Sequence, residues 1–169
     1  MGVYSAWEAS MEMPRFRFTK LFAFGVLVTT ALWAADLTLG TWQLNVKKSK
    51  FLPGPAFQSE TRSYEEQGDG VKVTIRTVDG KGRQVTSVFI TTPDGQQHAV
   101  SGSGGPADSV GLRRINEFTA ESTLMHAGKE IAKTTRVVSE DGKTLTITYK
   151  GLDPEGNPVD YTLLFDRLK

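Results

Sequence analysis

The sequence predicts an all-β domain, arranged as a single antiparallel up-and-down β-barrel of about 8–10 strands. Short segments rich in Val, Ile, Thr, Tyr and Phe alternate between apolar and polar residues, as in "VKVTIRTV" (71–78) and "TLTITYK" (144–150). Such alternation is typical of a sheet with one dry face. Turn residues separate the segments, and no long amphipathic helix is expected in residues 36–169. Because hairpins follow one another without helical crossovers, a barrel is favoured over the alternative, an open sandwich.

Each expected strand ends where turn residues interrupt the alternation. Turns are expected at "GDG" (68–70), "DGKG" (79–82), "PDGQ" (93–96), "DGK" (141–143) and "DPEGN" (153–157), since Gly, Asn and Asp tolerate the positive φ of tight hairpins. The strands are expected near residues 39–46, 57–66, 71–78, 83–91, 97–102, 109–118, 120–126, 130–139, 144–151 and 159–168.

Residues 1–35 have the order of a secretory signal peptide. Arg15, Arg17 and Lys20 form a basic lead, and the uncharged apolar run Leu21–Trp33 follows it. A membrane-spanning helix needs about 20 apolar residues, so this shorter run favours a removed signal over a retained anchor. We therefore expect an exported protein, periplasmic or secreted, with no stable membrane span after cleavage.

The expected cleavage site follows Ala34, and cleavage after Ala35 is the alternative. The first dozen residues do not resemble the start of a signal, which makes Met11 or Met13 alternative initiators. In either case the expected mature part is one β-barrel domain, residues 36–169.

Charge and cysteine content exclude several classes of function. Of the 20 basic residues, three precede residue 36, and of the 19 acidic residues two do, so residues 36–169 carry 17 of each. A neutral domain without a basic run is a poor binder of nucleic acid. The chain has no cysteine, which excludes thiol catalysis and requires the core alone to hold an exported domain together. We expect a monomer.

Two ends of the domain carry a family resemblance. Gly40-Thr41-Trp42 opens the first expected strand, and "YTLLFDRLK" places Arg167 near the end of the last one. Together they resemble the signature of the calycin superfamily, the lipocalins and fatty-acid-binding proteins. The resemblance implies a lipocalin-like barrel in which Trp42 closes one end and the Arg167 guanidinium stacks on its ring. The stretch "WQLNVKKSKFLPGP" (42–55) also resembles small exported bacterial proteins of unassigned role.

The chain departs from the fatty-acid-binding proteins at two places. Where those proteins carry an Arg-x-Tyr pair that grips the ligand carboxylate, Leu163 and Phe165 stand here. Where they insert a two-helix lid, only "KKSKFLPGPA" (47–56) connects the first two expected strands, and two helices need some 20 residues. The resemblance therefore does not imply that this chain binds fatty acids.

Candidate ligand-binding residues are arginines and aromatic residues on the expected strands: Arg76, Arg114, Arg136, Tyr149, Tyr161, Phe118 and Phe165. Arg113 and Arg114 are adjacent, so one of them faces inward if both lie in a strand. A buried arginine is costly unless paired, so an inward one indicates either an acidic ligand or an internal acid. The sequence leaves open which of the two arginines, Arg113 or Arg114, faces inward.

No pattern predicts an enzyme, a metal site or a cofactor. His98 and His126 are the two histidines, and they are not at metal-ligand spacing. Ser101 and Ser103 lie near His98 and Asp108 in sequence, but in a loop between strands, outside the strand-to-helix turn of a hydrolase nucleophile.

Two functions from different classes are compatible with these patterns. The first is a non-catalytic exported binding protein that holds a small apolar or amphipathic ligand inside the barrel. The alternative is a barrel filled by its own side chains, acting as an envelope structural or interaction protein. A cavity of several hundred Å³ favours the first function, and a filled interior favours the second.

Overall fold

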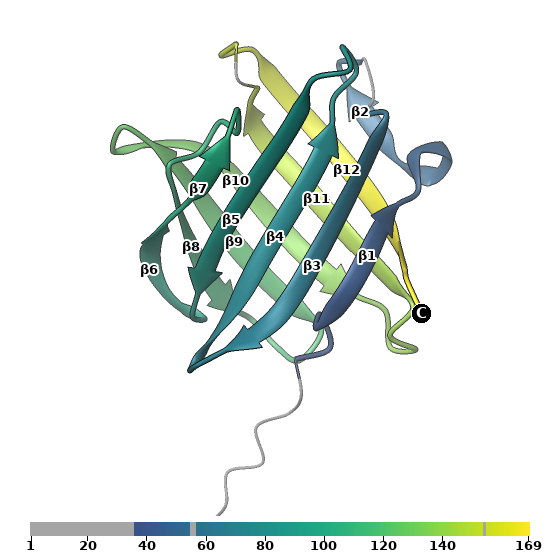
Figure 1. The fold of residues 1–169 in the computed structure, drawn as a ribbon, viewed down its shortest axis with the longest axis vertical. Helices are drawn as coiled ribbons and strands as arrows, with labels where there is room; N and C mark the ends of the chain where they lie inside the picture. The colour runs from purple at the N-terminus through teal and green to yellow at the C-terminus, as the bar shows by residue number, and fades with distance from the viewer. Residues whose placement is uncertain (1–35, 55–56, 154) are drawn as a thin grey trace, which may run out of the picture. The chain divides into compact units, whose positions relative to one another are not determined.

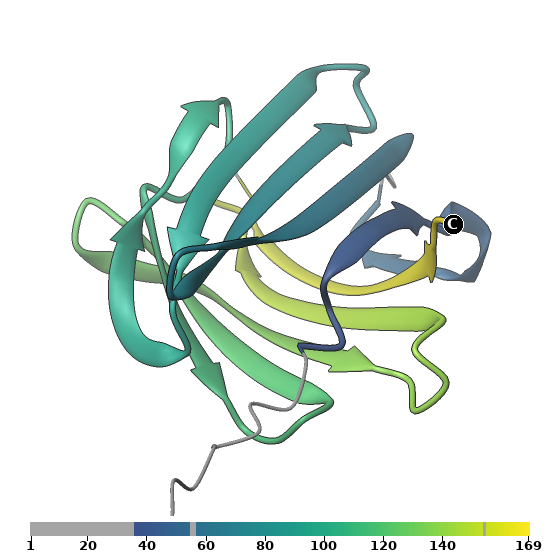
Figure 2. The ribbon, with the colours of Figure 1, turned by 60° about the horizontal axis from the view of Figure 1, so that its bottom comes forward.

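Antiparallel strands make up most of the described chain, residues 36–54, 57–153 and 155–169 of the computed structural model. They form one sheet that curls into a nearly closed barrel (Figures 1 and 2). The fold class predicted from sequence is confirmed. The described residues contain no α-helix, and their one helical segment is a 3₁₀ turn, η1 (Val46–Lys48).

Every expected strand is present, with small differences at its ends. The strands are β1 (Gly40–Leu44), β2 (Lys50–Leu52), β3 (Ser59–Gln67), β4 (Gly70–Val78), β5 (Gln84–Thr91), β6 (Asp94–Ala99), β7 (Ser101–Ser103), β8 (Ser109–Arg114), β9 (Thr119–His126), β10 (Lys129–Val138), β11 (Thr144–Leu152) and β12 (Pro158–Arg167). The expected strand at 97–102 is divided into β6 and β7, and β6 begins at Asp94, inside the turn expected at 93–96. The strand expected at 109–118 is shorter, since β8 ends at Arg114. Strand β2 is additional, since its residues were expected to form a connecting loop.

The strands follow one another around the barrel, and β1 returns to β12 to join the two ends of the chain. The order in the sheet is β6-β8-β9-β10-β11-β12-β1-β3-β4-β5-β7, and β2 adds to β12. Segment 94–103 crosses between the two edges of this order: β6 pairs with β8, and after Val100 the chain continues as β7, which pairs with β5. This crossing brings the barrel close to closure.

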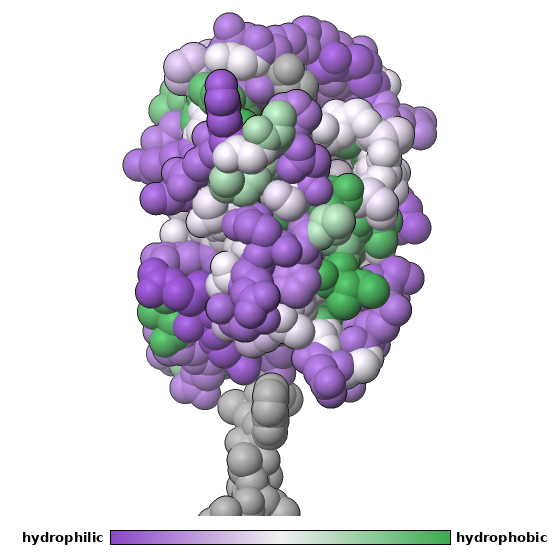
Figure 3. All heavy atoms as spheres, turned by 90° about the vertical axis from the view of Figure 1, so that its left-hand side faces the viewer, coloured by the Kyte–Doolittle hydropathy of each residue, from purple (hydrophilic) through white to green (hydrophobic). Residues whose placement is uncertain are grey.

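Alternate side chains of the strands point into the barrel and form its core. The buried core consists of Trp42, Leu44, Tyr64, Val73, Val138, Leu145, Ile147, Leu163 and Phe165. Most lie at every second strand position, as the period of a β-strand requires. Trp42 and Phe165 are the largest of the fully buried side chains. Polar side chains cover most of the outer face that carries β6 and β7, with hydrophobic ones gathered toward one side of the view (Figure 3).

The expectations for residues 1–35, namely the signal peptide, its cleavage after Ala34 or Ala35, and the initiators Met11 or Met13, lie outside the described residues. Within the described part of the chain, no helix has the length and apolar character that crossing a membrane requires.

Candidate functional site

Trp42 and Arg167 lie together at the base of the barrel, paired across β1 and β12. The indole N–H of Trp42 donates to the carbonyl oxygen of Thr38 at 2.7 Å. The Arg167 guanidinium carbon lies 4.1 Å from the centre of the Trp42 ring. Its N–H groups donate to three backbone carbonyls, those of Leu37, Leu39 and Gly142. Through its stacking and its charge-assisted hydrogen bonds, Arg167 joins the Trp42 ring to the segment before β1 and to the β10–β11 turn.

Gly40 makes room for this arrangement. Its φ is +116°, a value that residues with a side chain rarely adopt. A Cβ atom at this position would also lie 2.8 Å from Nη1 of Arg167. The glycine two residues before Trp42 is therefore required by the backbone and by the approach of the guanidinium.

A cavity of about 360 Å³ lies between this filled base and the upper end of the barrel. Its wall is mainly apolar and includes Val73, Ile75, Val85, Phe89, Val110, Leu112, Leu124, Ile147, Val159 and Leu163. Three of the residues predicted to bind a ligand, Arg136, Tyr149 and Tyr161, line it. A space of this kind can bury most of a small apolar molecule.

Four aromatic rings pack side by side on one wall near the mouth. Phe51 lies 5.4 Å from both Phe57 and Tyr161, and Tyr161 stacks on Tyr149 at 5.9 Å between ring centres. Strand β2 brings Phe51 to this place by pairing with β12 opposite Tyr161. The Tyr149 hydroxyl donates to the carbonyl of Leu152, and burial raises the pKa of Tyr149 to about 12. The hydroxyl is therefore neutral at ordinary pH.

An ion pair lies in the cavity wall on β3, where Glu60 and Arg62 both point inward. The Arg62 Nε donates to Glu60 Oε1 at 2.6 Å, and the hydroxyl of Thr77 donates to Glu60 Oε2 at 2.8 Å. Glu60 is 3% exposed. Burial disfavours the charged form of Arg62, but the Glu60 carboxylate more than offsets this, so the pKa of Arg62 is raised. The Arg62 guanidinium also lies 5.2 Å from the ring centre of Phe165.

Arg136 and Arg114 approach Asp36 below the cavity. The Arg136 guanidinium lies 5.1 Å from the Tyr64 ring centre, and its Nη2 lies 4.0 Å from Asp36 Oδ2. Burial alone would raise the pKa of Asp36, but hydrogen bonds from Thr38 and the charges of Arg136 and Arg114 hold it below its usual value. One terminal nitrogen of Arg114 is buried without a hydrogen-bond partner among the described residues.

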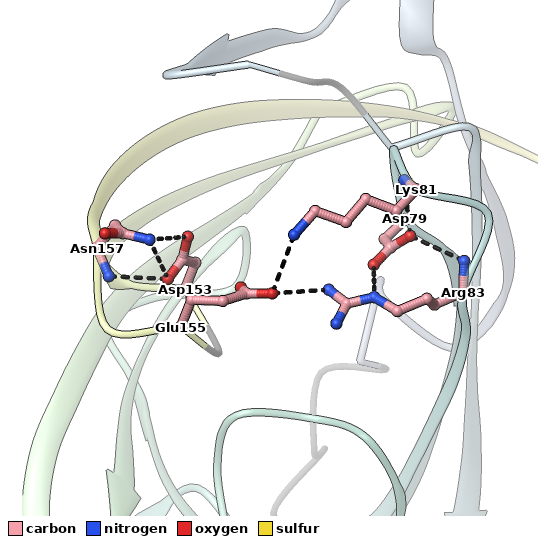
Figure 4. A network of polar contacts seen from close by, with 6 residues as sticks. All are labelled: Asp79, Lys81, Arg83, Asp153, Glu155 and Asn157. Atoms are coloured by element: carbon pink, nitrogen blue, oxygen red, sulfur yellow. Dashed lines mark hydrogen bonds and ion pairs between the residues drawn. The ribbon is translucent and has the colours of Figure 1, made fainter.

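Two hairpin turns meet across the mouth through Glu155 (Figure 4). The β4–β5 turn supplies Lys81 and Arg83, and the β11–β12 turn supplies Glu155. Glu155 Oε1 accepts a hydrogen bond from Lys81 Nζ at 3.3 Å and one from Arg83 Nη2 at 3.1 Å. Asp79 and Asp153 hold the two turns themselves, through bonds from Arg83 and Asn157 respectively. Since these side chains also line the cavity, the bridge narrows its mouth.

The other predicted ligand residues do not line the cavity. Arg76 is exposed on the outer face of β4, because strand neighbours alternate and Ile75 and Thr77 face inward. Phe118 lies in the β8–β9 turn, where its carbonyl accepts from Val138 N. Phe165 is fully buried in the core.

The arginine pair on β8 divides between the two faces. Arg114 is half-buried, and one of its terminal nitrogens is fully buried, so its side chain lies on the inner face. Arg113 is exposed and its Nη2 donates to Glu121 at 2.7 Å.

Glu60 and Arg62 are the site residues that the sequence analysis missed. The segment "SETRSYEEQ" (59–67) is polar at almost every position, so its alternation does not identify the inner face. The signal that was available is Glu60 and Arg62 two residues apart, followed two residues later by Tyr64. Opposite charges in register with an aromatic residue indicate a shared face.

The side chains of His98 and Ser101 make contacts that differ from those of a catalytic triad. His98 Nε2 lies 3.2 Å from the Thr92 hydroxyl and 3.6 Å from Asp94, so both neighbours share one ring nitrogen. A catalytic triad needs the acid and the nucleophile on opposite nitrogens. The Ser101 hydroxyl donates to the carbonyl of Val88 instead. Among residues 36–54, 57–153 and 155–169, no three His, Cys, Asp or Glu side chains form a group able to hold a metal ion.

No protein-family model and no curated protein sequence matches this chain. Among solved structures, it is similar to a zebrafish ileal bile acid-binding protein complexed with cholic acid, at 14% identity and a TM-score of 0.46, over 78% of this chain and 99% of that chain. At this level the likeness says nothing about the ligand of this chain. The nearly closed antiparallel barrel fits the calycin-like fold that the sequence resemblance implies.

Proposed function

We propose that this is an exported, non-catalytic binding protein that takes a small apolar or amphipathic molecule into its barrel. The observation that carries the proposal is the cavity of about 360 Å³ above the filled base. Small-molecule sites typically have volumes of about 300–1,000 Å³ and mainly apolar walls with a few polar groups. An interior filled to the mouth would have favoured the alternative, a structural or interaction protein of the envelope.

Burial of apolar surface supplies most of the binding free energy in this proposal. Each buried methylene group contributes about 0.8 kcal/mol, so a ten-carbon chain gains about 8 kcal/mol before the costs of ordering it. The aromatic wall of Phe57, Tyr149 and Tyr161 surrounds such a chain near the mouth. The polar side chains deeper in the cavity, Glu60, Arg62 and Arg136, orient its head.

Export is part of the proposal and rests on the signal-like residues 1–35. We expect the full-length chain, produced in an exporting bacterial host, to be recovered from the periplasm or the medium. N-terminal sequencing of that product is expected to begin at Ala35 or Asp36. Recovery of uncleaved protein from the cytoplasm would refute export and leave the binding proposal to be tested separately.

A matched pair of substitutions on β9 tests the cavity. Ser122 lines it, whereas the next residue, Thr123, has the opposite orientation. We expect the apolar dye N-phenyl-1-naphthylamine to bind the wild-type protein with increased fluorescence. Ser122→Phe is expected to abolish binding, and Thr123→Phe to preserve it, while far-UV circular dichroism shows both folded. Equal binding by both variants would place the dye outside the barrel and refute the proposal.

A further inference from the structure

We infer that the cavity selects ligands with an uncharged hydrogen-bonding head, such as a hydroxyl or a carboxamide, over carboxylates and ammonium ions, and that Glu60 sets this preference. The inference deepens the proposed function and rests on it.

The polar feature of the cavity wall is a charge pair whose two members neutralise each other. Glu60 and Arg62 are two residues apart on β3, so their side chains emerge on the same face. The bond from Arg62 Nε to Glu60 Oε1 is 2.6 Å long, a length typical of a charge-assisted hydrogen bond. Their side chains are 3% and 16% exposed, and both line the cavity.

This pair can still bind a ligand after making its own contacts. A guanidinium has five N–H donors, and Glu60 occupies the one on Nε of Arg62. A carboxylate has about four acceptor positions, and Glu60 uses two of them for the side chains of Arg62 and Thr77. A hydroxyl or carboxamide both donates and accepts, so it can bond to Glu60 and Arg62 together.

The second arginine of the cavity wall, Arg136, lies beside a carboxylate whose charge also acts on Arg114. Arg136 has Asp36 as its counter-charge at 4.0 Å, and the Tyr64 ring covers one side of its guanidinium. Over the whole wall and mouth, the charged lining residues are four acidic and four basic: Glu60, Asp79, Asp153, Glu155, Arg62, Lys81, Arg83 and Arg136. The residues that line the cavity therefore carry no net charge among themselves.

An ionised head meets a cost at Glu60 and Arg62. A carboxylate that approaches the donors of Arg62 comes beside the Glu60 carboxylate, and like charges repel strongly in a poorly solvated space. An ammonium ion meets Arg62 in the same way. Either head also loses its hydration on entry, which is costly without a partner of opposite charge.

Three ligands that share a ten-carbon chain and differ in their head group test the preference for an uncharged head on the wild-type protein. We propose competition of 1-decanol, decanamide and decanoate against N-phenyl-1-naphthylamine at pH 7.5, where a carboxylic acid is ionised. Decanol and decanamide are expected to bind at least tenfold tighter than decanoate. Tighter binding of decanoate would overturn this inference and leave the proposed function standing. No binding of the dye or of any of the three would refute the proposed function itself.

The variant Glu60→Gln tests whether Glu60 sets the preference for an uncharged head. This nearly isosteric change leaves Arg62 without its counter-charge, so the affinity for decanoate relative to decanol is expected to rise at least tenfold. The matched control is the double variant Glu60→Gln with Arg62→Gln, in which that gain is expected to disappear. An unchanged affinity ratio in a folded Glu60→Gln variant would overturn the role of Glu60. If the variant does not fold, the wild-type series decides the preference.

Discussion

Replacement of Arg167 by methionine removes the cation that holds the base of the barrel together. Methionine keeps most of the apolar length of the side chain but loses the stacking on Trp42 and the three hydrogen bonds to backbone carbonyls. The carbonyls belong to the segment before β1 and to the β10–β11 turn, so the change loosens two parts of the chain together.

The expected magnitude follows from these contacts. A hydrogen bond to a charged group contributes about 1.5–3 kcal/mol, but Arg167 is only partly buried, and water can replace it at the carbonyls. We therefore count about 1 kcal/mol for each bond and about 1 kcal/mol for the stacking. Arg167→Met is expected to lower the free energy of unfolding by about 4 kcal/mol. Arg167→Lys keeps the charge but not the planar fork, so about 2 kcal/mol is expected.

Urea unfolding measures this loss. Trp42 is the single tryptophan of residues 36–169, so its fluorescence reports the base directly, and far-UV circular dichroism reports the sheet. Arg76→Met is the matched control, because Arg76 is exposed on the outer face, and its loss is expected to cost less than about 0.5 kcal/mol. A cost below about 1 kcal/mol for Arg167→Met, or one equal to the control, would refute the reasoning.

Three further predictions concern the base and the mouth. Gly40→Ala places a Cβ atom 2.8 Å from Arg167 at a φ of +116°, and we expect a loss of about 2–3 kcal/mol by the same assay; a loss below about 0.5 kcal/mol would contradict the packing described. The pKa of Asp36 is lower folded than unfolded, so its ionised form stabilises the protein above its unfolded pKa of about 4, and this stability is lost as the pH falls through the folded value. Asp36→Asn is therefore expected to melt at a lower temperature at pH 7 and to show a smaller further decrease on acidification; an unchanged melting profile between pH 7 and pH 2 would argue against the link. Glu155→Gln weakens the bridge to Lys81 and Arg83, so stopped-flow dissociation of bound dye is expected to be several-fold faster at low salt and less sensitive to added salt. A dissociation rate equal to that of the wild type at every salt concentration would show that the bridge does not limit exit.

The barrel could be predicted from sequence because its determinants are local. Alternation in segments such as 71–78 and 144–150, and turn residues between them, specify hairpins without knowledge of distant contacts. Strand β2 escaped prediction because its three residues, Lys50–Leu52, have too little alternation to stand out. It forms only because β12 offers an edge opposite it, and that is a tertiary effect.

The site was only partly predictable, for a different physical reason. Arg136, Tyr149 and Tyr161 lie on strands whose inner face is marked by apolar neighbours, and they line the cavity. The Glu60–Arg62 pair lies on a strand that is polar on both faces, so its orientation depends on pairing with β1 and β4. In the bridge at the mouth, Glu155 lies 74 residues after Lys81 and 72 residues after Arg83 in sequence. No local pattern encodes contacts over such separations.

The most direct test of the proposed function is to identify what the protein carries when it is isolated. We propose native mass spectrometry of the full-length gene product after export, followed by solvent extraction and identification of bound small molecules. The proposed function predicts a stoichiometric apolar or amphipathic compound, and the inference about Glu60 predicts that its head is uncharged. A clean mass without ligand, together with no binding of N-phenyl-1-naphthylamine, would contradict the binding function and favour a structural or interaction role for the barrel.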